Sequence, residues 1–166
     1  MKKITLIAAL LLCFTLAFTA CASSYRSDVA VNDLTSAVLN AVSTAGGFTA
    51  ADSDYVDLEF TKPDVISANV DQWSICASTS SSTVDEFGIF RVKEGGDVGA
   101  VKAEVSDYVQ SMQVKLEVYL DMYDPAEKTK LENAQVFVYG NYVVFTMLSE
   151  ADTTALTSAI EGALKN

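Results

Sequence analysis

Two alternating segments joined by Gly140-Asn141 constrain the fold more than any other feature of this chain. A two-residue connector of this composition favours a primed turn, which would pair Tyr139 with Tyr142 and fix the register of both strands. Successive strand residues point to opposite faces of a sheet. One predicted face is therefore wholly apolar, and it consists of Ala134, Val136, Val138, Val143, Phe145 and Met147. Such a face must be covered, so we expect helices to pack on it.

The other periodic segments predict three helices and a second hairpin. Apolar residues recur at helical spacing over 31–42, over 98–123 and after Ser149, where Asp152 three residues on resembles a capping box. Strand-like segments at 72–80 and 86–92 flank a Ser/Thr-rich turn. Residues 55–60 are compatible with a short strand. Pro125 ends the long helix, and a loop is expected from there to about Asn133.

The order helix, hairpin, helix, hairpin, helix predicts a single α+β domain over residues 30–166. We expect a two-layer sandwich, in which an antiparallel sheet of four to five strands carries about three helices on one face. About 146 residues follow position 20, enough for one domain with one core.

The N-terminus reads as an export signal. Lys2 and Lys3 precede an apolar run of about 15 residues, shorter than the roughly 20 that a membrane-spanning helix needs. Small residues then stand before Cys21, which predicts a lipoprotein signal peptide over residues 1–20, lipidation of Cys21 and a short tether over 21–29. Phe18 departs from the usual leucine of such signals. An ordinary signal peptidase could instead cut after Ala22 and release a secreted protein.

The charge of the exported part excludes one class of partner. Removing Lys2 and Lys3 from the 11 basic residues leaves 9 against 22 acidic ones, a formal net charge of -13. So acidic a surface is unsuited to nucleic-acid backbones. It also repels an anionic bilayer, so attachment to the cell membrane would depend on the lipid.

Several kinds of chemistry are missing. The chain contains no histidine, which argues against Ser-His-Asp and Cys-His hydrolases and against His-ligated zinc. Asp52, Asp54, Asp57 and Glu59 form the densest acidic stretch, and calcium takes such oxygen ligands. The glycine and the distal glutamate of an EF-hand loop are absent, so a solvated acidic loop is the favoured interpretation. We expect no metal, no cofactor and no catalytic residue.

Cysteine and tryptophan residues point mainly to structure. Cys13 leaves with the signal peptide and Cys21 would carry the lipid, so Cys76 has no disulfide partner. Its strand-like surroundings favour a small buried residue over a reactive thiol. Trp73 begins the same apolar alternation and is expected in the core.

The second face of the last hairpin carries Phe137, Tyr139 and Tyr142, where a one-sided sheet would present polar residues. Tyrosine is favoured at interfaces, so these three residues are a candidate binding surface. The alternatives are that other segments of the chain cover this face, or that the tyrosines only stabilise the hairpin.

Four ordered segments carry a family resemblance. They are the run from Asp85 to Lys93, Asp97-Val98 at the start of a long helix, Leu131 to Ala134, and Val138 to Val143. Together they resemble a family of small lipoproteins from anaerobic Gram-positive bacteria, catalogued as a domain of unknown function (DUF4358). The resemblance covers roughly residues 30–165. It implies a lipoprotein on the outer face of a single cell membrane, and it brings no activity, cofactor or catalytic residue.

Three functions are compatible with these features. The favoured one is a non-catalytic, membrane-tethered binding or accessory module that engages an envelope protein or a wall ligand. The alternative is a carboxylate-dependent hydrolase acting on wall or lipid material, which requires two acids in one cleft. A third is an accessory subunit whose helix over 98–123 packs on a partner through an exposed apolar stripe.

Overall fold

The computed structural model of the protein describes residues 25–44, 47–123 and 125–165. The predicted signal peptide and Cys21 lie outside this part of the chain. No helix within the described ranges is long and apolar enough to cross a membrane. Residues 25–29 of the predicted tether pack against the domain, because Arg26 N donates to Leu164 O at 2.9 Å and Tyr142 Oη donates to Val29 O at 2.7 Å. The folded part therefore begins before residue 30.

Five antiparallel strands form one sheet in the order β1-β2-β3-β5-β4. Their bounds are β1 (Phe48–Ala50), β2 (Val70–Ser78), β3 (Glu86–Val92), β4 (Gln135–Tyr139) and β5 (Tyr142–Met147). Both predicted hairpins are present, as β2–β3 and β4–β5. Tyr139 pairs with Tyr142, which confirms the register expected from the turn. Gly140 in that turn has a φ of 62°, which glycine adopts without strain.

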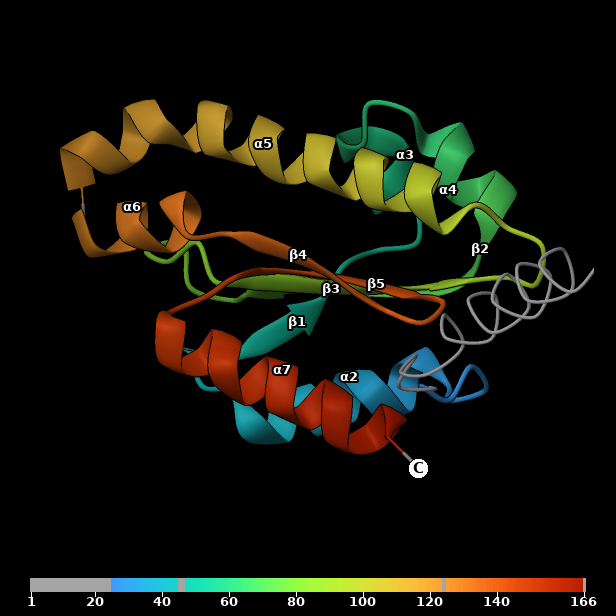
Figure 1. Cartoon of the computed structure of the whole chain (residues 1–166). Coiled ribbons are helices and arrows are strands. Elements are labelled where there is room, and N and C mark those ends of the chain that lie inside the picture. The colour runs from blue at the N-terminus through green and yellow to red at the C-terminus, as the bar shows by residue number, and fades with distance from the viewer. Residues whose placement is uncertain (1–24, 45–46, 124, 166) are drawn as a thin grey trace, which may run out of the picture.

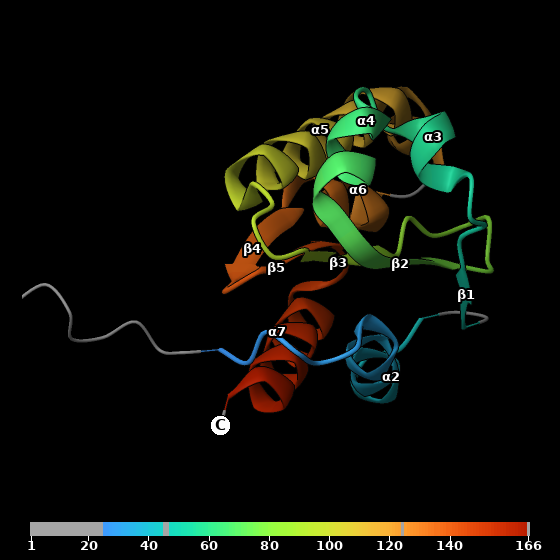
Figure 2. The ribbon, with the colours of Figure 1, turned by 90° about the vertical axis from the view of Figure 1, so that its right-hand side faces the viewer.

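Helices cover both faces of this sheet (Figures 1 and 2). On one face lie α3 (Tyr55–Glu59), α4 (Pro63–Asn69), α5 (Val98–Tyr123) and α6 (Pro125–Glu132), and on the other lie α2 (Val31–Ala41) and α7 (Glu150–Leu164). The α+β class and the antiparallel sheet are confirmed. The expectation that the helices share one face is wrong.

Both faces need a cover because the central strands are apolar on each side. Phe90 of β3 and Phe145 of β5 belong to the hydrophobic cluster under α5. Phe87 and Ile89 of β3 belong to a second cluster, together with Leu34 of α2 and Leu156 of α7. A strand that buries both faces must have a layer of structure on each side.

Two short helices replace elements predicted otherwise. Residues 55–59 form α3 instead of a strand, and Val56 and Phe60, one helical turn apart, both point into the core. Pro125 ends α5 as expected but also opens α6, where a loop was predicted. Proline is well suited to the first position of a helix, since its missing N–H has no partner there anyway.

The remaining helix predictions are confirmed. Ser149 caps α7, with its side chain accepting a hydrogen bond from Asp152 N at 3.2 Å. The apolar stripe of α5 is buried at Val101, Val105 and Tyr108. α6 then lies against the C-terminal half of α5, where Gln113 Nε2 donates to Leu131 O at 2.6 Å.

Candidate functional site

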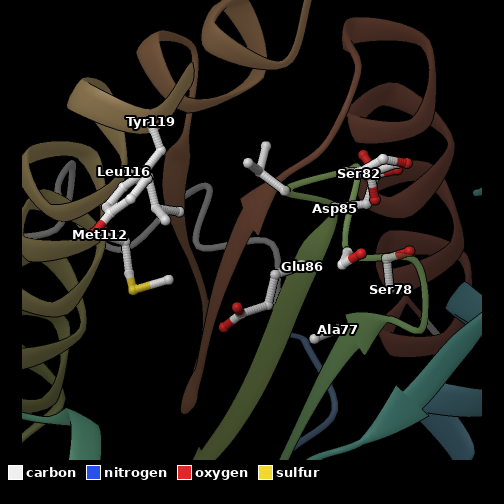
Figure 3. A pocket seen from close by; sticks show the side chains of 11 residues that line it. Ala77, Ser78, Ser82, Asp85, Glu86, Met112, Leu116 and Tyr119 are labelled. Carbon is white, nitrogen blue, oxygen red and sulfur yellow. The ribbon is translucent and has the colours of Figure 1, made fainter. Parts of the chain in front are cut away.

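A pocket of about 630 Å³ lies between the C-terminal half of α5 and the start of β3. Met112, Leu116 and Tyr119 of α5 form one wall. The other wall consists of Ala77 and Ser78 of β2 and residues 81–85 of the β2–β3 connection. Figure 3 shows Glu86 between these walls, with its carboxylate directed towards α5. The pocket thus combines an apolar wall, a hydroxyl-rich rim and one inward-pointing carboxyl group.

The local sequence explains why Glu86 points inward. It shares a face of β3 with Gly88 and Phe90, and this face lies against α5. The residue is only 5% exposed. Tyr108 Oη donates to Glu86 Oε1 at 2.6 Å, and Tyr55 Oη lies 2.8 Å from Tyr108 Oη. The second carboxylate oxygen, Oε2, has no hydrogen-bond partner among the described residues.

Burial controls the ionisation of this group. It raises the pKa of Glu86 to about 7, against a smaller opposing effect of the hydrogen bond from Tyr108. Burial also raises the pKa of Tyr55 to about 12 and shifts the pKa of Tyr108 further upward. Near neutral pH both tyrosines therefore remain protonated donors, whereas Glu86 exchanges between its charged and neutral forms. Such perturbed groups are concentrated at functional sites.

Asp85, the neighbour of Glu86, is held by a separate ion network. Lys130 Nζ lies 2.7 Å from Asp85 Oδ1 and 2.8 Å from Glu127 Oε1. Thr44 donates to the other oxygen of Asp85, and Val84 N donates to Glu127 Oε2 at 2.9 Å. Although burial opposes it, hydrogen bonding to Asp85 and Glu127 raises the pKa of Lys130. Asp85 thus has both oxygens engaged, and Glu86 is the carboxyl with a free one.

The predicted aromatic surface is buried. Tyr142 is 0% and Tyr139 5% exposed, and both lie in the cluster beneath α2 and α7, with Phe137 packed against it. Tyr25 packs on Tyr139 in an edge-to-face arrangement, with ring centroids 5.4 Å apart. The prediction of a binding surface is therefore wrong at Tyr139 and Tyr142, which other segments of the chain cover, whereas Phe137 is half-buried at the edge of the same cluster.

The acidic stretch and Cys76 fit the structural interpretations. Asp52, Asp54 and Asp57 are exposed, and Glu59 pairs with Lys115 at 2.9 Å. No group of side chains able to hold a metal ion gathers in the described part of the chain. Cys76 is 2% exposed, and burial raises the pKa of its thiol. Trp73 packs half-buried against the cluster under α5.

The stripe of the long helix is covered only in part. Met112 and Leu116 are half-buried and Tyr119 is 63% exposed, all beside the pocket. The exposed end of the stripe is therefore a pocket wall.

Sequence reasoning missed Glu86 as a site residue, although a signal was present. In β3 the positions that alternate with Glu86 are Gly88, Phe90 and Val92, so a carboxyl group opens an otherwise apolar strand face. A buried tyrosine hydroxyl needs a partner, and Tyr108 stands in the predicted buried stripe. Strand alternation together with this unsatisfied hydroxyl could have identified the pair.

A comparison with known protein families matches the segment of the chain that forms the pocket. The family described as domain of unknown function (DUF4358) matches residues 64–148. That segment runs from α4 to the end of β5 and includes the described lining of the pocket. No curated protein and no solved structure gave a significant match.

Proposed function

We propose that this chain, which belongs to the DUF4358 family, is a membrane-anchored extracytoplasmic module that binds a small ligand in the pocket between α5 and β3 without catalysing its conversion. The observation that carries the proposal is the pocket itself. Its volume of about 630 Å³ falls within the range of small-molecule sites. Such sites have mostly apolar walls with a few placed polar groups, as Met112, Leu116 and Glu86 provide here.

The arrangement of acids favours binding over hydrolysis. A two-carboxylate mechanism needs a proton donor and a second carboxylate that are both free to reach the substrate. Asp85 has its oxygens engaged by Lys130 and Thr44, which leaves Glu86 alone. The sequence also supplies no histidine as a general base.

Attachment to the membrane rests on Cys21. We expect the Cys21→Ser variant to lose incorporation of labelled palmitate and to leave the detergent phase in a phase-partition assay, because serine has no thiol to accept the diacylglyceryl group. A wild-type protein without label, whose N-terminus begins at Ser23, would instead support cleavage after Ala22 and secretion.

Filling the pocket tests the binding role. Ala77 lines the pocket beside Glu86, with which it pairs across β2 and β3. The probe is octanol carrying a photoreactive diazirine, applied to the lipoprotein in phosphatidylcholine nanodiscs. Labelling of tryptic peptides 103–115 and 116–128, which carry Met112, Leu116 and Tyr119, reports occupancy. We expect Ala77→Phe to reduce saturable labelling about tenfold or more, because the ring occupies the ligand's space.

Ala151→Phe is the matched control, since Ala151 is exposed on α7 across the sheet. It should label like the wild type. Equal labelling in Ala77→Phe, or labelling that never saturates, would refute the pocket as a ligand site.

A further inference from the structure

We infer that the ligand of this pocket is a small amphiphile with a single primary amine, whose ammonium group binds Glu86 Oε2 while its apolar body lies against Met112 and Leu116. This inference rests on the proposed function, because it names the chemical class that the pocket would hold.

Unsatisfied polar atoms define what the ligand must offer. Glu86 is 5% exposed, and only its Oε1 accepts a hydrogen bond among the described residues. The hydroxyl of Thr83, which also lines the pocket, is buried without a partner in the described structure. The buried, unpaired hydroxyl of Thr83 costs free energy that a partner on a ligand would recover, whereas Glu86 Oε2, which is not among the buried unpaired atoms, is open to the pocket. An ammonium group brings three donors and no acceptor, so one group could serve both oxygens.

Charge selects an amine over an acid. The described lining contains Asp85 and Glu86 and no basic residue. Lys130, which does not line the pocket, forms an ion pair with Asp85. No cation pairs with Glu86 among the described residues. A ligand carboxylate would be repelled by an ionised Glu86, and a neutral alcohol would leave its charge uncompensated. A cation within hydrogen-bonding distance resolves both problems.

The apolar wall of the pocket determines which ligand body can bind beside the amine. Met112 and Leu116 are half-buried on α5 with Val84 on the opposite side. Methionine adapts its shape to irregular apolar partners, so this wall suits an alkyl or aryl body of variable form. A polyamine would place a second charge against these side chains, so the pocket suits a ligand with one amine.

Competition against the photoreactive octanol tests the class. The competitors are octylamine, octanol and octanoate, which share one chain and differ in the head group. The assay is run at pH 8, where Glu86, with a pKa of about 7, is mainly ionised. We expect octylamine to compete at a concentration about 10- to 100-fold lower than octanol, as for a charge-assisted hydrogen bond, and octanoate to be the weakest.

Glu86→Gln should abolish the preference for octylamine and leave competition by octanol in place. Glu94→Gln, which removes one carboxylate from an exposed loop, is the matched control and should keep the preference. The preference surviving in Glu86→Gln would overturn the assignment to Glu86. Octanol or octanoate competing as well as octylamine in the wild type would overturn the amine class while leaving a ligand pocket. Absence of saturable labelling by any probe would refute the proposed function itself.

Two sources could present the same amine chemistry. Discs that also contain phosphatidylethanolamine separate them. Loss of probe labelling in those discs would identify a lipid head group as the source. Competition by free octylamine without that loss would identify a soluble amphiphile. Both results support the amine class.

Discussion

The Lys130→Met variant is expected to lose about 3–5 kcal/mol of unfolding free energy. Lys130 lies between the carboxylates of Asp85 and Glu127, whose side chains are 6% and 8% exposed. Methionine fills much of the space of the lysine stem but leaves two buried negative charges without a counter-charge. Removing one partner from a buried ion network therefore costs far more than the net contribution of the network. Urea denaturation at neutral pH measures the loss.

Lys62→Met provides the matched control. Lys62 Nζ lies 3.7 Å from Asp107, and the two side chains are 63% and 51% exposed. Removing this surface pair should change the unfolding free energy by less than about 1 kcal/mol. Similar losses of unfolding free energy in the two variants would contradict the expectation that the buried pairs of Lys130 matter more than an exposed pair.

Glu86→Gln is expected to gain about 2–3 kcal/mol of unfolding free energy over the wild type when the pH is raised from 5 to 8. The pKa of Glu86 is raised from 4.5 to about 7 by folding. The folded state therefore holds a proton that the unfolded chain has already released. The wild type loses stability as the pH rises from about 4.5 to about 7, and then levels off. Glutamine stays neutral throughout, and its amide oxygen can accept the hydrogen bond from Tyr108.

Denaturation curves for both proteins between pH 5 and pH 8 check this result. Tyr108 of α5 and Tyr55 and Glu59 of α3 are the titratable groups that act on Glu86 across the packed face. The tyrosines keep their protons over this range, because burial raises the pKa of each. Glu94→Gln, with the same change of charge, should follow the wild type. An undiminished pH dependence in Glu86→Gln would assign it to another group.

The parts of the fold that could be predicted from sequence are those with a strong local signal. Gly140-Asn141 determines the turn, and strand alternation then determines every pair of the β4–β5 hairpin. α5 has 26 residues, about seven turns, so its periodic apolar pattern predicts a helix without tertiary information. α3 and α6 have 5 and 8 residues, too short for periodicity to separate a helix from a strand or loop. Phe60, the residue directly after α3, stacks on Tyr108 with ring centroids 4.4 Å apart, a tertiary contact that the local sequence does not reveal.

The site was harder to predict, because its meaning depends on which layer covers which face. Tyr139 and Tyr142 suggested a surface only on the assumption of one helical layer. With α2 and α7 on that side, the same residues are core. Glu86 is the opposite case. The sequence does not single it out, because the chain has many acidic residues, and only its position under α5 marks it as a site residue. Asp85 and Lys130 lie 45 positions apart, and no local pattern links them.

The chain enters the domain at one end of the sheet and opens its pocket at the other. Ser27 O accepts a hydrogen bond from Asn141 in the β4–β5 turn at 3.4 Å, whereas Glu86 pairs with Met147 at the opposite end of β5. The five strand steps from Glu86 to Arg91 cover about 17 Å. In a domain anchored through Cys21, the pocket would therefore lie at the end of the sheet away from the anchor. A ligand dissolved in the surrounding aqueous phase could then enter the pocket without first passing the point of attachment.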